Sequence, residues 1–254
     1  MLKLCNNEDI EPLKNFLDVS DPLAAYILCR IECYGFEKSF CETWLCLGER
    51  GITAALSVFC GNAVIYNAGT ADFEELGLFL RSGCFNTLLT DLLAAEKLSF
   101  TDYEKKQALL YGTEPPEAVC GTASEYKQTY SLLCECFPHE YSNVKEQYLE
   151  WLSDLTFRKR RGFARVKSVF EGGELCANVL TVAETSKNAV IGGVCCAKEK
   201  RGRGFAGAAV LSAVSELKSE NKDVFVLAKD DVANGFYKKL GFEFYKNVAY
   251  IERR

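Results

Sequence analysis

The sequence predicts a mixed α/β fold built as two similar domains, each with a mixed central sheet flanked by helices. Segments with helical periodicity alternate with segments typical of strands along the whole chain. The order of these segments in the first half is nearly repeated in the second half. Two prolines and two glycines cluster in YGTEPPEAVCGT, which favours a join there. We therefore expect one domain at 1–118 and another at 119–254.

The second half shows the pattern most clearly. Amphipathic helices are predicted near 124–136 and 144–160, and a third helix is predicted to follow a glycine loop and end near residue 219. The predicted strands are FARVKSVF, ELCANVLTVAE, NAVIGGVCCA, DVFVLA and the closing FEFYKNVAYIER. DVANGFYKKL, which lies between the last two strands, is predicted to be a helix.

The first half offers much the same order. NEDIEPLKNFL, PLAAYILCRIECY, DFEELGLFLRSG and LLAAEKL are predicted helices. TWLCLGER, ITAALSVF, AVIYNA, FNTLL and KKQALLYG are predicted strands. Where the second half has its basic glycine loop, the first half has NAGTADFEEL, so we expect the first domain to lack the chemistry of the second.

Composition favours a soluble, cytoplasmic protein that does not act at a membrane. The chain has 254 residues and is 48% hydrophobic, enough to bury a core, and no apolar run approaches the roughly 20 residues of a membrane span. The start, MLKLCNNEDIEPLK, lacks the apolar centre of a secretory signal. Thirteen cysteines without a CxxC pair, and a single histidine, predict reduced packing residues and no metal site.

Charge is divided unevenly between the two halves. Residues 1–118 hold 9 Lys and Arg against 18 Asp and Glu, a net charge of -9, whereas residues 119–254 carry +4. This division favours a second half that faces an anion and a first half that attracts a cationic partner, although two ordinary solvated surfaces would give the same numbers. Neither half is basic enough to indicate a nucleic-acid partner.

The stretch KRGRGFAGAAVL, which begins at residue 200, carries the strongest local signal. A helix N-terminus presents unpaired N–H groups that attract phosphate, and glycines allow close approach of the backbone. Arg201 and Arg203 add fixed cations. The alternative is a plain turn on a basic surface. The glycines of this stretch also fit G-x-G-x-x-G, the pattern of a dinucleotide-binding loop, with Asp230 as the acidic residue. Only 47 residues follow Gly207, however, which is too few for a dinucleotide domain.

These residues resemble the GNAT superfamily of N-acetyltransferases. AVIGGVCCAKEKRGRGFAGAAVL resembles its acetyl-CoA signature, Q/R-x-x-G-x-G/A after the fourth strand, with Arg201, Gly204 and Ala206 in the three defined places. DDVANGFYKKLGFEFY resembles the second signature of the family and follows in the expected order. Lys198 stands where many members have proline, and Asp230 where many have asparagine.

The resemblance implies tandem GNAT-like folds, the first degenerate and the second able to bind acetyl-CoA as co-substrate. The backbone N–H groups implied to hold the pyrophosphate belong to Gly202, Arg203, Gly204, Phe205 and Ala206. The strand residues implied to pair with the pantetheine arm are Val194, Cys195 and Cys196, and Asn234 could hydrogen-bond the same arm. The two parallel strands beside this arm are implied to splay apart.

Acyl transfer to an amine also needs a proton donor for the leaving thiolate. Tyr237 matches the tyrosine of the family that supplies this proton, although it could instead be a packed helix residue. The strand at 188–197 has no carboxylate, so Glu184 is the nearest candidate for the general base, and transfer through ordered water is the alternative.

The sequence thus predicts an N-acetyltransferase that acts on an amine of a small molecule or peptide, with a cationic acceptor favoured by the charge of the first half. The first domain is expected to form part of the acceptor pocket or to stand in for a dimer partner within a monomer. His139, Glu140 and Tyr141 could contact the acceptor or be ordinary loop residues. A non-catalytic acyl-CoA-binding module and a nicotinamide-dependent oxidoreductase remain alternatives.

Overall fold

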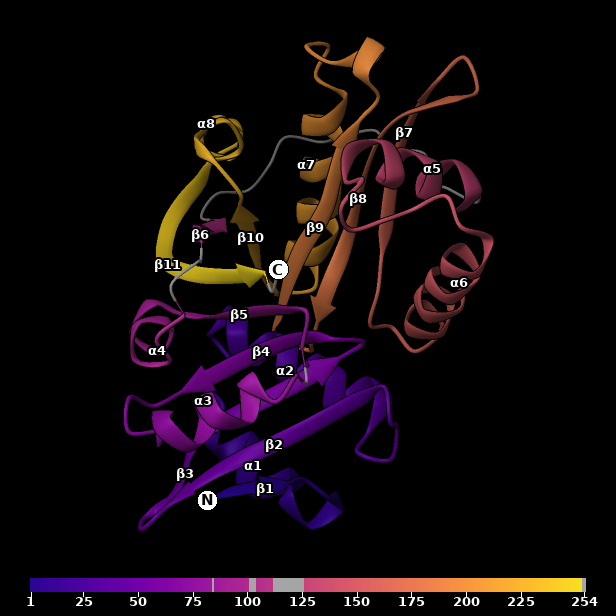
Figure 1. The fold of residues 1–254 in the computed structure, drawn as a ribbon. Coiled ribbons are helices and arrows are strands. Elements are labelled where there is room, and N and C mark those ends of the chain that lie inside the picture. The colour runs from indigo at the N-terminus through magenta and orange to yellow at the C-terminus, as the bar shows by residue number, and fades with distance from the viewer. Residues whose placement is uncertain (84, 101–103, 112–125, 253–254) are drawn as a thin grey trace. The chain divides into compact units, whose positions relative to one another are not determined.

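The computed structural model describes residues 1–83, 85–100, 104–111 and 126–252 (Figure 1). The chain divides into two compact units. The first unit comprises Met1–Leu109, Leu227–Asn234 and Phe244–Arg254, and the second comprises Leu110–Val226 and Gly235–Glu243. The predicted join between residues 118 and 119 lies outside the described residues. The last strand of the chain therefore groups with residues from its beginning.

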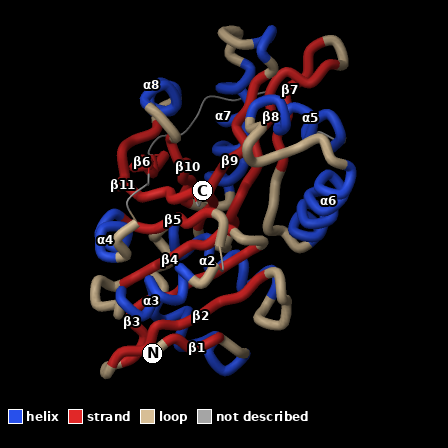
Figure 2. Tube along the Cα trace, in the orientation of Figure 1, coloured by secondary structure: helices blue, strands red, loops and turns tan. Residues whose placement is uncertain are grey.

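Helices and strands of the first unit alternate as the sequence predicts (Figure 2). Its helices are α1 (Ile10–Phe16), α2 (Pro22–Tyr34), α3 (Phe73–Arg81) and α4 (Leu92–Lys97). Its strands are β1 (Leu2–Leu4), β2 (Cys41–Gly48), β3 (Gly51–Phe59), β4 (Asn62–Asn67), β5 (Thr87–Asp91) and most of β11 (Phe242–Glu252). A further strand, β6 (Glu104–Tyr111), lies mostly in this unit. Strand β1 was not predicted.

The strands of the first unit follow the order β1-β2-β3-β4-β5-β11. Neighbours are antiparallel except β4 and β5, which run parallel. The closing strand β11 pairs with β5 from Val248↔Asp91 to Glu252↔Thr87. The sequence predicted this strand but assigned it to the second domain, because periodicity does not identify a strand's partner.

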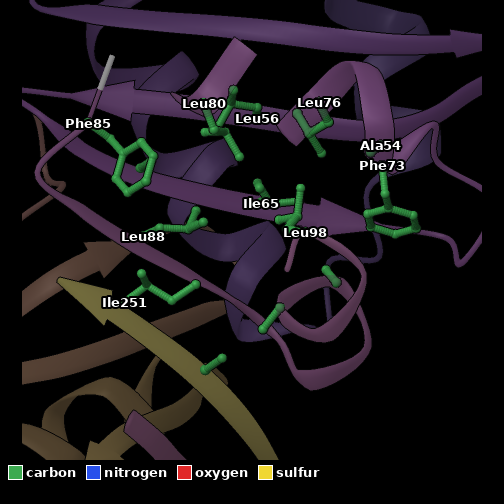
Figure 3. Packing of buried hydrophobic residues seen from close by; sticks show 14 of the residues in the cluster. Ala54, Leu56, Ile65, Phe73, Leu76, Leu80, Phe85, Leu88, Leu98 and Ile251 are labelled. Atoms are coloured by element: carbon green, nitrogen blue, oxygen red, sulfur yellow. The ribbon is translucent and has the colours of Figure 1, made fainter. Parts of the chain in front are cut away.

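Helices cover both faces of this sheet. On one face α1 and α2 pack on strand residues such as Leu45 and Val64, and on the other α3 and α4 pack on residues such as Leu56 and Ile65. Figure 3 shows the second of these cores, in which Ile251 of β11 lies near Leu88 of β5. Both faces of β11 are therefore enclosed in the first unit where it pairs with β5.

The second unit also matches the predicted order of elements. Its helices are α5 (Tyr126–Cys136), α6 (Lys145–Arg160), α7 (Phe205–Ser219) and part of α8 (Asp231–Lys239). Its strands are β7 (Val166–Glu171), β8 (Glu174–Glu184), β9 (Asn188–Cys196) and most of β10 (Asp223–Ala228), in the order β10-β9-β8-β7. The hairpin between β7 and β8 turns at Gly172 and Gly173, whose φ values of 61° and 85° suit a two-residue turn.

Two layers of helices enclose this sheet. Leu133 of α5 and Leu155 of α6 pack in one cluster with Cys195 of β9. The next strand residue, Cys196, accepts a hydrogen bond on its thiol from the backbone of Ala206 in α7. Because successive strand side chains point to opposite faces, α7 lies on the face opposite α5 and α6, as Figure 1 also shows.

A buried ion network fixes the end of the sheet where β9 begins. Glu184, whose side chain is 1% exposed, accepts hydrogen bonds from Arg165 at 2.6 Å and Lys222 at 2.6 Å. Arg165 also pairs with two glutamates of the α7 end, Glu216 and Glu220. The network ties the start of β7 and the end of β8 to the C-terminal end of α7. Among the described residues, no helix is long and apolar enough to cross a membrane.

Candidate functional site

A β-bulge shapes the second half of β9. Asn178 pairs with Cys195 and Leu180 pairs with Gly192, so one β8 residue opposes two residues of β9. Gly193 adopts φ +56°, and a Cβ there would lie 3.0 Å from a methyl group of Leu180. The buried Asn178 side chain donates a hydrogen bond to the Gly193 carbonyl at 3.4 Å. Asn178 thus holds the bulge in place, and only glycine fits at residue 193 without a shift of Leu180.

Beyond this bulge β9 parts from β10. The parallel register of the two strands runs from Asn188↔Asp223 to Ile191↔Val226, whereas β9 remains beside β8 as far as Cys196. In the described part of the second unit, residues 192–196 therefore have a strand neighbour on one side only. Such an edge offers backbone donors and acceptors to an extended amide-bearing molecule. The predicted parting of the two strands, which places Val194, Cys195 and Cys196 on this edge, agrees with the register.

The loop after β9 ends in an open helix N-terminus. Gly202 and Gly204 adopt φ values of +77° and +85°, and Gly204 is the N-cap residue of α7, with no side chain to cap the helix. Among the described residues, no hydrogen-bond acceptor is recorded for the backbone N–H groups of residues 202–205. The Ala206 N–H is directed at the Cys196 thiol. This end of α7 has the unpaired donors that bind anions in other helices.

The predicted cations of this loop already have partners. Arg203 donates to Glu171 of β7 at 2.8 Å, and Lys200 donates to the same carboxylate at 3.0 Å. Arg203 also lies over the Phe205 ring, 4.8 Å from its centroid. Arg201 turns the other way and donates from Nε to the Cys196 carbonyl at 3.2 Å. To contact a bound phosphate, Arg203 and Lys200 would therefore have to leave Glu171 or contact both anions at once.

Leu240, which directly follows α8, packs against the start of α7. A Cβ on Gly207 would be 3.3 Å from Cδ2 of Leu240, which explains the third glycine of the loop by close packing. Tyr237 lies one turn before Leu240, is 6% exposed, and contacts the rings of Phe236 and Phe242. Burial raises the pKa of its phenol, so the hydroxyl stays protonated at neutral pH.

Two further predicted residues lie on or next to α8. The side-chain oxygen of Asn234 is buried without a hydrogen-bond partner, so this residue can still accept a bond from an amide N–H. Asp230 accepts a hydrogen bond from the Ala233 N–H at 2.8 Å and thereby caps the helix. Asp230 is therefore engaged in the helix cap, which weakens the dinucleotide interpretation.

Glu184 is the predicted residue that the structure does not bring to this site. It pairs with Ala189 at the start of β9, at the opposite end of the strand from Cys195 and Cys196. Its carboxylate is enclosed by Arg165 and Lys222. The expectation that Glu184 acts as the general base is therefore corrected, because a carboxylate enclosed by two cations at the far end of the strand cannot reach the acceptor.

The comparisons agree with this geometry. Residues 167–251 match the family model described as FR47-like protein, which is GNAT-related. No curated protein matches the chain. A GCN5-related N-acetyltransferase from Sphaerobacter thermophilus is 17% identical, with a TM-score of 0.64 and coverage of 99% of this chain and 95% of that one. A tandem GNAT protein from the clavulanic acid biosynthesis pathway is 15% identical, with a TM-score of 0.63 and coverage of 99% and 98%.

A GNAT-family acetyltransferase from Colwellia psychrerythraea covers 100% of both chains at 12% identity and a TM-score of 0.59. The chain has a tandem GNAT fold. The bulged strand, the open helix N-terminus and the tyrosine of α8 all lie within the FR47-like segment of this fold.

The first GNAT-like unit differs at the corresponding helix. Asp72 caps α3, and its Oδ1 accepts from the N–H groups of Glu74 at 3.1 Å and Glu75 at 3.0 Å. At the start of α7, by contrast, the N-cap residue Gly204 has no side chain that could cap the helix. Glu74 and Glu75 add negative charge in the first turn. A phosphate would thus meet occupied donors and like charge at α3, which supports the prediction that this unit lacks the site.

The sequence analysis missed three residues that shape the site. Gly193 could have been found, because a Gly-Gly pair inside a strand is a signal for a bulge. Glu171 and Cys136 gave no local signal. Glu171 is 32 residues before Arg203, and Cys136 is 65 residues before Arg201, whose Nη2 lies 4.0 Å from its sulfur. Only the fold brings these pairs together.

Proposed function

We propose that the second GNAT unit binds acetyl-CoA and transfers its acetyl group to a primary amine. The observation that carries the proposal is the open N-terminus of α7, where Gly202 and Gly204 leave backbone donors unpaired next to the free edge of β9. A pyrophosphate needs such donors, and a pantetheine arm with two amides needs such an edge.

The residues of the second unit fit this co-substrate in two respects. The N–H groups of residues 202–205 would hold the pyrophosphate, and the edge at Val194 and Cys196 would pair with the arm. Acetyl-CoA supplies the activated acetyl thioester. The chain itself supplies position and charge, which are the main contributions of a protein to such a transfer.

Tyr237 is the proposed proton donor. Its buried hydroxyl keeps its proton at neutral pH, and Oη can donate this proton to the sulfur of the departing thiolate as the thioester bond breaks. With Glu184 held in the ion network, we propose that the acceptor amine loses its proton to water rather than to a carboxylate.

We propose a cationic acceptor of low molecular weight or a peptide amine. The support is the net charge of -9 on residues 1–118, which raises the local concentration of cations. Because exposed charges are screened by salt, activity on a diamine should fall between about 20 and 500 mM salt, whereas activity on a neutral amine should change much less. Equal salt dependence for both acceptors would contradict the cationic assignment.

Calorimetric titration with acetyl-CoA tests the site. The Arg201→Glu, Gly204→Glu double variant should abolish binding at one site per chain. The matched control is Arg161→Glu, Gly162→Glu, which makes the same changes in the same unit. Gly162, at φ +80°, also has open space around its Cβ position, so strain is matched. Equal binding by both double variants, or no binding by the parent protein, would contradict the proposed site.

The second candidate function is an acyl-CoA-binding module without catalysis. It is favoured by the position of Glu184, which lies away from the site at the end of β8. The described residues of β9 contain no carboxylate that could act as base instead. The two functions differ in turnover and not in affinity. Release of free thiol from acetyl-CoA in a screen of primary amines separates them, since a binding module releases none above the uncatalysed rate.

A further inference from the structure

Two thiols meet beside the glycine loop of the second unit. Cys136 ends α5 and is half-buried, whereas Cys195 on β9 is 4% exposed. Cys136 packs against the apolar cluster that contains Cys195, and the two side chains share a hydrogen bond. The sulfur of Cys136 also lies 3.7 Å from the carbonyl of Cys196, the residue next to Cys195, so the two thiols are neighbours on one face of β9.

The surroundings of Cys136 favour its thiolate. The groups that face it are the Cys195 thiol and the Cys196 backbone from β9, and the Arg201 guanidinium from the loop. The hydrogen bond from Cys195, together with Arg201, lowers the pKa of Cys136 to about 6. The same contact raises the pKa of Cys195, so Cys195 keeps its proton while Cys136 is ionised.

The other thiols among the described residues lack this combination. Of the described cysteines, eight are buried, and only Cys60, Cys136 and Cys196 are at least partly exposed. Cys134, two residues before Cys136 on the same helix, is buried, and burial raises its pKa. A redox-sensitive thiol needs thiolate character, access to solvent and a second thiol in reach, and Cys136 has all three.

We propose that Cys136 is a hydroperoxide-reactive thiol that forms a reversible disulfide with Cys195. The Cys136 thiolate attacks one oxygen of the hydroperoxide, so that a sulfur–oxygen bond forms, the oxygen–oxygen bond breaks, and an alcohol or water leaves after protonation. Cys195 then attacks the sulfenic sulfur. A sulfur–sulfur bond forms, and the hydroxide leaves with the Cys195 proton as water. Two thiols are oxidised and one hydroperoxide is reduced.

The disulfide would join the last residue of α5 to the bulged end of β9 and remove the thiolate that faces Arg201. Any effect on acetyl-CoA affinity rests on the proposed function. The formation of the bond does not, so the test below contains no CoA and its outcome is independent of the transferase proposal.

The experiment treats the reduced full chain with one equivalent of hydrogen peroxide at pH 7, blocks the remaining thiols and maps tryptic peptides. The expected product links peptide 128–145 to peptide 188–198 and disappears after reduction. Because Cys134 shares the first peptide and Cys196 shares the second, Cys134→Ala and Cys196→Ala are the matched controls, and both should keep the link. Cys136→Ala should lose it.

Cys195→Ala should stop the reaction at the sulfenic acid, which dimedone traps on Cys136. A measurement on the unsubstituted protein avoids any effect of substitution on folding: alkylation of Cys136 by iodoacetamide should be half-maximal near pH 6. The proposal is overturned if Cys60 is oxidised while the two peptides stay unlinked, or if alkylation of Cys136 rises only above pH 8.

Discussion

Arg203 of the glycine loop is bound by Glu171 of the neighbouring hairpin strand, with Nη1 donating to the carboxylate at 2.8 Å. Lys200 joins the same carboxylate, and these two cations, Arg203 first, lower the pKa of Glu171 to about 2. The carboxylate is thus ionised throughout the physiological range. It occupies the cations that a phosphate group of the proposed co-substrate CoA would otherwise meet, and it would compete with that group.

Replacing Glu171 with Gln should therefore tighten CoA binding by roughly two- to fivefold, because exposed ion pairs are individually weak. Calorimetry at low salt measures the change. Glu174→Gln is the control, since Glu174 lies on the same hairpin but is 77% exposed and contacts only Lys200, at 3.6 Å, among the described cations. Weaker binding by the Glu171 variant would mean that the carboxylate positions the loop instead of competing.

Replacing Glu184 with Gln should lower the free energy of unfolding by about 3 kcal/mol, because breaking a buried ion pair leaves charges without compensation. Arg165 and Lys222 would be those charges. Urea denaturation measures the loss, and Glu174→Gln should change stability by less than about 0.5 kcal/mol. The folded Glu184 variant should retain its acyl-transfer rate. A lost rate in a fully folded variant would restore Glu184 as a base.

Stability should fall in acid partly through Glu220. Arg165 and then Lys222 lower the pKa of Glu220 to about 2, against about 4.3 in an unfolded chain. A lowered folded-state pKa stabilises the protein above the unfolded value, and this contribution is lost as the pH falls from about 5 towards 2. The drop in Tm between pH 6 and pH 3 should therefore be smaller in Glu220→Gln than in the parent protein. Glu199→Gln, at an exposed position, should behave like the parent.

Replacing Tyr237 with Phe should reduce kcat by at least about a hundredfold, the usual contribution of a general acid, and leave acetyl-CoA affinity within about twofold. Steady-state thiol release and calorimetry give the two values. Tyr148→Phe in α6 of the same unit controls for loss of a hydroxyl. If the Tyr237 variant kept full turnover, the phenol would be a packing residue and the proton would come from solvent.

Replacing Ile251 with Ala should destabilise the first unit by about 2–5 kcal/mol, because Ile251 is 3% exposed and packs in its core. Phe244→Ala on the same strand, at a side chain that is 53% exposed, is the control. Denaturation followed by the fluorescence of Trp44, a residue packed against that core, reports on this unit. An unchanged Trp44 transition would mean that β11 contributes little to the first unit.

The elements and the glycine loop could be predicted from the sequence because their causes are local. Alternation of apolar residues produces strands, and Gly202 and Gly204 are needed where the backbone takes positive φ. Gly207 is explained differently, since it has helical geometry and makes room for Leu240. The spacing of the glycines was correctly recognised, but the reason for the third glycine needed the contact of α7 with Leu240.

The remaining features depend on contacts between distant segments. In the sequence Glu184 looks like an ordinary carboxylate at a strand end. The structure shows that Arg165 and Lys222 enclose it. Cys136 lies in an apolar stretch like many others, and only its contacts with Cys195 and Arg201 change its chemistry. Charge partners of this kind leave no periodic signal in a single sequence. The glycine loop could therefore be predicted from the sequence, but the distant residues that contact it could not.

The pairing of β11 with β5 has a consequence for how the chain folds as it is synthesised. Strand β5 ends at Asp91, and β11 does not begin until Phe242. At about 5–20 residues per second, a ribosome needs roughly 8–30 s to make the intervening residues. During that interval the nascent first unit must keep the edge of β5 open for a strand that does not yet exist. Its sheet can close only after β11 itself has been synthesised.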